Sequence, residues 1–188
     1  MNGQSGPLGD VLKQLDDAML PPTTGDALID VVQEIRETLV KCSSSMKKQL
    51  VQFHSSFDKI ESRLFCNALL HPSMMRNVHS LKPSELPSNE PLSFVGDAYF
   101  SLYVARYCFE TGVAANQFHI VRQILCCNAH LSRVFDKFFG TVVDSCFKHN
   151  AGSLKKHKAQ ILEALIGLLV QRGYYGLADV ICKEAIDT

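Results

Sequence analysis

The chain has 188 residues, of which 46% are hydrophobic and 20% charged, and its formal net charge at pH 7 is zero. This composition is typical of a globular protein with one full core, and it argues against a disordered chain. Proteins that bind nucleic acid on their own are usually clearly basic, so any such contact here must come from a local patch or from a partner.

The remaining bulk features favour an intracellular protein without a membrane anchor. The 7 cysteines are an odd number, which predicts reduced thiols rather than a disulfide framework. No apolar run reaches the ~20 residues of a membrane-spanning helix, so no membrane contact is expected. The first arginine is Arg36, a poor match to an Arg-rich transit peptide. Three histidines without metal-ligand spacing are expected at the surface: His79, His119 and His130.

Residues 1–56 are predicted to form an N-terminal helical extension. The short amphipathic piece Leu8–Leu20 is stopped by two prolines. Beyond it, apolar residues recur every three or four positions at Leu28, Val32, Ile35, Leu39, Cys42, Met46, Leu50 and Phe53. This spacing predicts a long helix packed on its own domain, with an intermolecular coiled coil as the alternative. The low helix propensity of Ser43–Ser45 could break the helix in two.

Residues 57–188 are predicted to form a larger helical domain. Surface loops are expected at Met74–Asn89 and in a basic linker that ends at Lys158. No stretch shows the alternation of a strand, so the predicted fold class is all-α. Apolar spacing of 3.6 residues predicts helices over Phe57–Leu70, Asn89–Tyr107, Phe118–Phe139, Gln160–Val170 and Tyr174–Ile186.

Two of these helices carry a single acid inside an otherwise apolar run. Asp97 follows Ser93 by one turn in the first helix, and Glu163 follows Gln160 in the second. A buried acid is costly unless its charge is compensated, and a metal ion is one candidate for that compensation. From the residues alone, a helix cap or a salt bridge explains Asp97 more simply, and a polar contact with the basic linker explains Glu163 more simply.

Three motifs in a fixed order resemble the signature of the ribonuclease III domain family. They are NALLHPS (Asn67–Ser73), NEPLSFVGDAYF (Asn89–Phe100) and AQILEALIG (Ala159–Gly167). Between the second and third motifs, the family has a further conserved helix, and five residues of this chain match its pattern: Arg122, Leu125, Asn128, Leu131 and Ser132. The resemblance covers Phe57–Ile186 and implies a ribonuclease III-type helical domain with an extra N-terminal helical arm. His71 and Ser73 are expected to be structural.

The resemblance implies an enzyme that cuts double-stranded RNA with four carboxylates holding Mg²⁺ or Mn²⁺. Asp97 and Glu163 keep the acid at two of these positions, whereas Ser93 and Gln160 replace it at the other two. Glu90 is expected to be at most a weak further metal ligand, if the domain is active. Losing two acids should weaken the binding of a hard cation and slow hydrolysis by orders of magnitude. We therefore expect a degenerate, inactive domain without a cofactor, or one that uses Mg²⁺ or Mn²⁺ if it is active.

The resemblance also implies partners, since family members pair around an RNA duplex through the helix that carries the second motif, here called the signature helix (Asn89–Tyr107). An inactive member is expected to act as a scaffold, in a homodimer or in a heterodimer with another ribonuclease III-domain protein. Similar noncatalytic members occur in mitochondrial RNA-editing and ribosomal complexes, and a mitochondrial location rests on this resemblance alone. The predicted dimer interface is Leu92, Phe94, Val95 and Tyr99, and the predicted RNA-binding residues are Lys155, Lys156 and Lys158.

Two alternatives stay open at this point. One is an active small ribonuclease III that cleaves double-stranded RNA. The other is a helical protein-interaction module without RNA contact.

Overall fold

The computed structural model describes residues 26–70, 88–140 and 154–188, and within these ranges it contains seven α-helices and no strand. The prediction of an all-α fold is therefore confirmed. The α-helices are α2 (Asp26–Phe53), α3 (Phe65–Leu69), α4 (Glu90–Glu110), α5 (Phe118–Leu125), α6 (Asn128–Phe139), α7 (Leu154–Gln171) and α8 (Tyr175–Asp187). Short 3-10 turns lie at Ser55–Lys59 (η1), Ser62–Leu64 (η2) and Ala115–Gln117 (η5). None of the described helices is long and apolar enough to cross a membrane.

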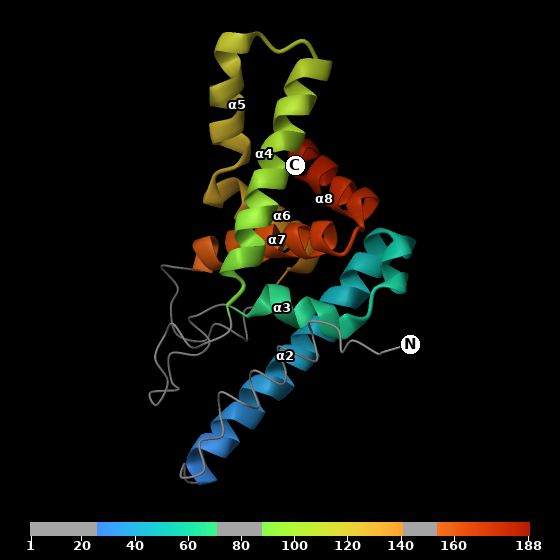
Figure 1. Ribbon diagram of the computed structural model, residues 1–188, viewed down its shortest axis with the longest axis vertical. Helices are drawn as coiled ribbons and strands as arrows, with labels where there is room; N and C mark the ends of the chain where they lie inside the picture. The colour runs from blue at the N-terminus through green and yellow to red at the C-terminus, as the bar shows by residue number, and fades with distance from the viewer. Residues whose placement is uncertain (1–25, 71–87, 141–153) are drawn as a thin grey trace, which may run out of the picture.

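Helix α7 lies at the centre of the molecule, and α3, α4, α6 and α8 all pack against it (Figure 1). Its side chains are buried on nearly all sides from Ile161 to Leu169, as is expected of a helix that is apolar all round. The helix begins at Leu154, six residues before the predicted start. The lysines assigned to a basic linker therefore lie in its first turns.

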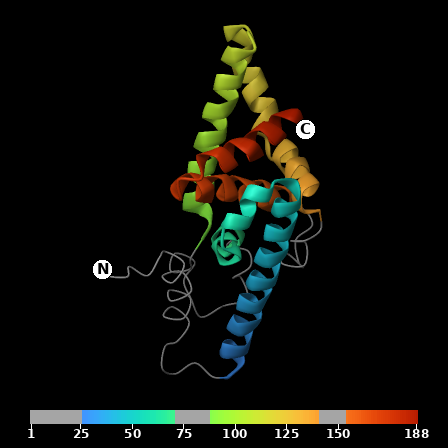
Figure 2. The same cartoon turned by 90° about the vertical axis from the view of Figure 1, so that its right-hand side faces the viewer.

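Helix α2 is continuous, so Ser43–Ser45 does not break it. Ser43 is buried, and its hydroxyl donates a hydrogen bond to the backbone oxygen of Ser62, which compensates its low helix propensity. The second half of α2 contributes its apolar stripe to the common core, whereas the first half extends away from the body (Figure 2). The predicted boundary between an N-terminal extension (1–56) and a larger domain (57–188) remains a prediction. The second half of α2 packs into the same core as the helices of the larger domain. The stripe in the core is Leu39, Cys42, Met46 and Leu50.

Two predicted helices are interrupted. Phe57–Leu70 was expected to be one helix, but extended backbone at Ile60 and Glu61 divides it into η1, η2 and α3. Phe118–Phe139 is divided into α5 and α6 by extended backbone at Cys127. In both cases apolar side chains continue to face the core through the break, which is why periodicity alone did not reveal it.

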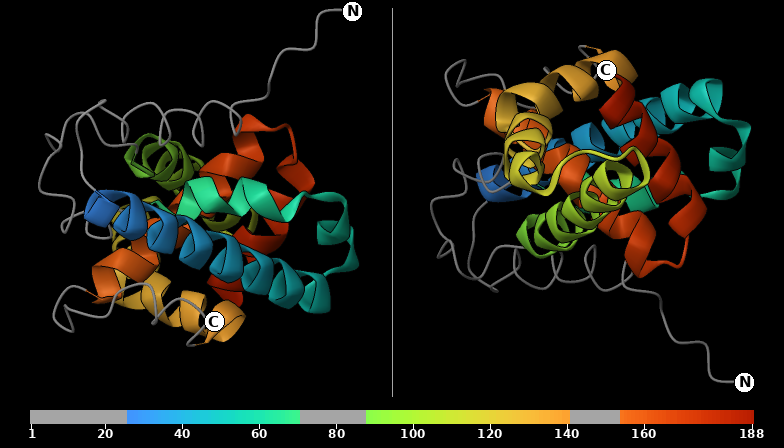
Figure 3. Two further views of the ribbon diagram at one scale, coloured as in Figure 1. Left: turned by 90° about the horizontal axis from the view of Figure 1, so that it is seen from below. Right: turned by 90° about the horizontal axis from the view of Figure 1, so that it is seen from above.

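Helices α4 and α5 lie side by side and project from the body (Figures 1 and 2). The turn between them contains Gly112 at φ +71°, a left-handed conformation that favours glycine. Viewed from below, α4 is seen nearly along its axis, whereas α2 lies across the view (Figure 3). The crossing of α4 over the central α7 positions the candidate site.

Candidate functional site

Helices α4 and α7 cross with their backbones in contact, because a glycine from each helix faces the other. A Cβ atom added to Gly96 would lie 1.8 Å from the backbone oxygen of Glu163. A Cβ atom added to Gly167 would lie 2.0 Å from the backbone oxygen of Leu92. Any larger side chain at either glycine would therefore separate the helices. The crossing brings the signature helix and the Glu163 helix together, although 71 residues separate Gly96 from Gly167 in the chain.

The two acids of the sequence analysis meet at this crossing. Asp97 follows the crossing glycine of α4, and Glu163 supplies the backbone oxygen against which that glycine packs. Burial, and secondly the negative charge of Asp97, raises the pKa of Glu163 to about 7. The charge of the Asp97 carboxylate therefore acts on the Glu163 carboxyl group. Near neutral pH, Glu163 exchanges its proton readily.

The two residues at the remaining acid positions bond to the start of α4. The Ser93 hydroxyl donates to the backbone oxygen of Glu90 at 3.0 Å, and the Gln160 amide donates to Oδ1 of Asn89 at 3.0 Å. Asn89 is completely buried, and its own amide donates to the backbone oxygen of Ala68 at 2.7 Å. Gln160 thus joins α7 to the start of α4 and, through Asn89, to α3. Glu90 is exposed in the first turn of α4 and does not contribute to the shifted pKa of Glu163.

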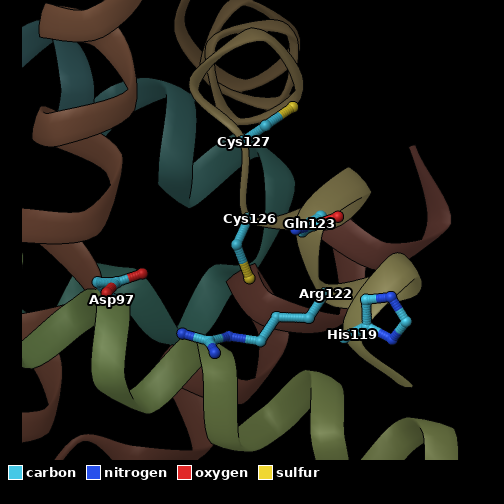
Figure 4. A pocket seen from close by; sticks show the side chains of 6 residues that line it. All are labelled: Asp97, His119, Arg122, Gln123, Cys126 and Cys127. Atoms are coloured by element: carbon cyan, nitrogen blue, oxygen red, sulfur yellow. The ribbon is translucent and has the colours of Figure 1, made fainter. Parts of the chain in front are cut away.

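A cleft of about 380 Å³ opens beside Asp97, between α4 and α5. Figure 4 shows Arg122 extending from α5 across the cleft toward Asp97, with the thiol of Cys126 beside its guanidinium. The Nε–H of Arg122 donates to Oγ of Ser101 at 3.3 Å. Burial raises the pKa of the Cys126 thiol, so this group is neutral at physiological pH. The full lining is Asp97, His119, Arg122, Gln123, Cys126 and Cys127.

Sequence reasoning did not identify this cleft as a site. The sequence marks Arg122 only as part of a family motif. It predicts that His119 lies at the surface, and His119 is exposed. The available signal was spacing, because residues 119, 122, 123 and 126 share one side of a helix by the three- and four-residue rule. His130, also expected at the surface, is instead buried, and its Nε2 lies 2.7 Å from the backbone oxygen of Ala185. His71, Ser73 and His79 lie outside the described residues.

The predicted RNA-binding lysines differ in their surroundings. Lys155 and Lys156 are exposed on the first turn of α7. Lys158 is buried, and its ammonium group lies 2.7 Å from a carboxylate oxygen of Asp136 on α6. Only Lys155 and Lys156 present their charge to solvent, so the structure brings two of the three lysines to a surface.

The predicted interface residues also differ in exposure. Phe94 is 77% exposed, whereas Leu92 and Val95 are half-buried, and Leu92 packs against the core. The hydroxyl of Tyr99 donates to Asp179 of α8 at 2.8 Å. Tyr99 therefore already packs within its own chain. Phe94 begins a stripe of exposed apolar residues along α4, here called the α4 stripe: Phe94, Ala98, Leu102, Ala105 and Phe109.

Comparison with known families identifies the segment that holds this site. Residues 90–174 match the ribonuclease III domain. The match runs from the first residue of α4 to Tyr174, just before α8, so it contains the helix crossing, both acids and the cleft. It does not extend to the NALLHPS motif, which the sequence analysis included. No curated protein and no solved structure matches the chain.

The residues at the crossing do not fit the four-carboxylate metal cluster of the ribonuclease III domain. Mg²⁺ is held mainly by anionic oxygen, and here only Asp97 and Glu163 are acids. Ser93 and Gln160 supply neutral groups that bond to the backbone and to Asn89. Among the residues that the structure describes, no three His, Cys, Asp or Glu side chains are arranged to hold a metal ion.

Proposed function

We propose that this chain is a ribonuclease III-like domain that does not cleave RNA and that serves as a dimerising scaffold subunit in an RNA-processing or ribonucleoprotein complex. The observation that carries the proposal is the state of the four acid positions. Two of them are acids, one with a raised pKa, and the other two are neutral groups bonded to the start of α4. An intracellular and mitochondrial setting remains part of the proposal.

Phosphodiester hydrolysis by a metal-dependent nuclease needs a cation that activates water and stabilises the leaving oxygen. Two carboxylates provide less negative charge than four, and a hard cation is held mainly by charge, so such a cation would be held less firmly. Removing one group that stabilises charge in the transition state typically lowers the rate on the order of 10²–10³-fold. The loss of two acids therefore supports a role that does not depend on cleavage.

The α4 stripe supports the association part of the proposal. Phe94, Leu102 and Phe109 are 77%, 68% and 79% exposed, and they lie on one side of a helix that projects from the body. Large apolar side chains gathered on one exposed face usually mark an interaction surface. Ribonuclease III domains typically dimerise, so the partner is a second copy of this chain or another ribonuclease III domain. Lys155 and Lys156 are exposed on the first turn of α7, which supports the proposal that they contact phosphates of an RNA held by such a pair.

A cleavage assay tests the first part of the proposal. Duplex RNA is incubated with the purified chain in Mg²⁺ and, separately, in Mn²⁺, and the expected result is no cleavage in either. The control variants are Asp97→Asn and Glu163→Gln. Cleavage that either substitution abolishes would overturn the proposal and establish the active-enzyme alternative.

Sedimentation tests the second part. Phe94→Ala should weaken association by about 2–4 kcal/mol if Phe94 is a central anchor of the interface. Ile124→Ala is the matched control, because Ile124 is 58% exposed but lies on α5 outside the α4 stripe. A wild-type chain that is monomeric at tens of micromolar would point to a partner of a different sequence. If it also stayed monomeric with every candidate ribonuclease III partner, the scaffold proposal would fail.

A further inference from the structure

Positive charge is concentrated in the second half of α2 and in the two 3-10 turns that follow it. Residues 41–63, here called the basic segment, contain five basic residues and two acids, so their formal charge is +3. Because the whole chain has a formal charge of zero, all other residues together carry −3. A local patch of this kind is what a neutral chain needs in order to contact nucleic acid. The basic residues are Lys41, Lys47, Lys48, Lys59 and Arg63.

A hollow of about 410 Å³ lies on the basic segment, where η1 and η2 fold back beside α2 (Figure 1). Two lysines of α2 line it, Lys47 and Lys48, together with hydroxyl and amide groups from Ser44, Gln52 and Ser62. Of the described residues in its lining, only Val51 is apolar and none is aromatic. Sites for small organic ligands are mostly apolar, so this lining suits a charged and well hydrated ligand instead.

The lysines of α2 have two different roles. The ammonium group of Lys47 donates to the backbone oxygen of Asp58 at 2.9 Å and lies 3.6 Å from the carboxylate of the same residue, so it fixes η1 beside α2. Lys41 and Lys48 are exposed, and within the described ranges neither forms an ion pair. These two lysines are two helical turns apart, about 10 Å along α2. Their charge is therefore available to a ligand that extends along the helix.

The neutral groups of this face favour the backbone of a nucleic acid. Lys41, Ser44, Lys48 and Gln52 follow each other at three- and four-residue spacing, so they share one side of α2. Serine and glutamine side chains commonly bond to phosphate and sugar oxygens, which positions a protein without reading sequence. Proteins that hold single strands usually stack the bases on aromatic rings, and the hollow offers none. An RNA duplex keeps its bases paired and is recognised through phosphates and 2′-hydroxyls.

We propose that the basic segment binds the phosphate backbone of an RNA duplex through Lys41 and Lys48, with Ser44 and Gln52 bonding to the same backbone. The segment lies outside residues 90–174, which match the ribonuclease III domain. It is therefore a second RNA contact, separate from Lys155 and Lys156. It requires neither cleavage nor the α4 stripe.

The test is fluorescence anisotropy of a labelled RNA duplex of about 16 base pairs, titrated with the purified chain between about 50 and 200 mM salt. Lys41→Gln and Lys48→Gln should each reduce the slope of log Kobs against log salt concentration by about 0.7–0.9, the contribution of one phosphate contact. The double reversal Lys41→Glu/Lys48→Glu should weaken binding at least about tenfold at 100 mM salt. Lys183→Gln is the matched control, because Lys183 is an exposed lysine of α8, and it should leave the slope unchanged. Urea midpoints equal to that of the wild type show that the variants are folded.

Three results would overturn the proposal. Equal slopes for the wild type, Lys41→Gln and Lys48→Gln would show that the RNA contacts lie elsewhere. The absence of saturable binding up to about 100 µM protein at the lowest salt concentration would show that the chain does not bind duplex RNA. Displacement of the duplex by poly-L-glutamate as effectively as by unlabelled duplex of equal total charge would identify an acidic protein segment as the ligand. None of these results bears on cleavage or sedimentation, which test the proposed function.

Discussion

The contact between α4 and α7 can be tested by adding one methyl group to either crossing glycine. In Gly96→Ala the new Cβ atom would lie 1.8 Å from a backbone oxygen, whereas ordinary contact begins at 3.4 Å. In Gly167→Ala the corresponding distance is 2.0 Å. The obstructing atom belongs to the backbone of a central helix in both cases. No side chain can rotate to relieve the clash, and the two helices must separate.

The expected cost follows from two opposing effects. Overpacking of a well-packed core typically costs about 1–3 kcal/mol and sometimes more, and this clash lies at the upper end because the backbone itself must move. Alanine is favoured over glycine inside a helix by about 1 kcal/mol, which offsets part of the loss. We therefore expect Gly96→Ala and Gly167→Ala each to lower the free energy of unfolding by about 2 kcal/mol or more. This is a large fraction of the roughly 5–15 kcal/mol that stabilises a typical domain.

Urea unfolding followed by circular dichroism measures this loss as a lower midpoint. Gly176→Ala is the matched control, because Gly176 lies in α8 and an added Cβ atom there would have nothing within 4 Å. It should gain up to about 1 kcal/mol. The double variant Gly96→Ala/Gly167→Ala should lose less than the sum of the single losses, because the first substitution already separates the helices. If Gly96→Ala unfolded at the wild-type midpoint, the close crossing and the site built on it would be refuted.

Three further perturbations probe the site and its surroundings. Because the folded pKa of Glu163 is about 7 and its ordinary value is 4.5, its contribution to stability is full below about pH 4.5 and falls as pH rises through 7. Glu163→Gln should remove this loss of stability, which is at most about 3 kcal/mol. In urea unfolding, the variant should therefore be more stable than the wild type at pH 8 but not at pH 4.5. Parallel pH profiles of the two proteins would contradict this prediction. Asn89→Ala should cost about 1–3 kcal/mol in the same assay, because it removes the buried hydrogen bond to the Ala68 carbonyl and the one that Asn89 accepts from Gln160. A loss no larger than that of an exposed substitution would count against the network. In RNA binding, Lys155→Ala should reduce the salt slope by about one counterion, whereas Lys158→Ala should leave the slope nearly unchanged, since only the ammonium group of Lys155 is exposed. An equal reduction in both variants would show that both ammonium groups reach phosphates, and an unchanged slope in Lys155→Ala would show that Lys155 does not.

Local patterns predicted the helices where apolar residues repeat without interruption. Asn89–Tyr107 was predicted as a helix and corresponds to α4. The start of α7 was placed six residues too late, because its first turns carry lysines and a histidine instead of an apolar repeat. The ion pair between Lys158 and Asp136 lets that turn be buried without an apolar side chain. A pattern that scores only hydrophobicity does not detect burial of this kind.

The geometry of the site depends on contacts between residues that are distant in sequence. Spacing predicted that Asp97 and Glu163 lie on two apolar helices, and the family motifs predicted that the helices meet. The register of the crossing is set by Gly96 against Glu163 and by Gly167 against Leu92, and neither contact leaves a signal within its own helix. The cleft on the other side of Asp97 depends on where α5 packs, which local sequence does not specify either.

The crossing also explains why two acids can remain where two others are replaced. Interlocked glycines hold α4 and α7 together through backbone contact, so the fold does not require a cation to draw Asp97 and Glu163 toward each other. The remaining cost of their proximity is met by a raised pKa at Glu163, which lets one carboxylate take up a proton. At the replaced positions, neutral side chains avoid further repulsion and supply hydrogen bonds to the start of α4. The backbone contact of α4 with α7 therefore holds the crossing together with two acids in it, and the α4 stripe lies exposed along the same helix.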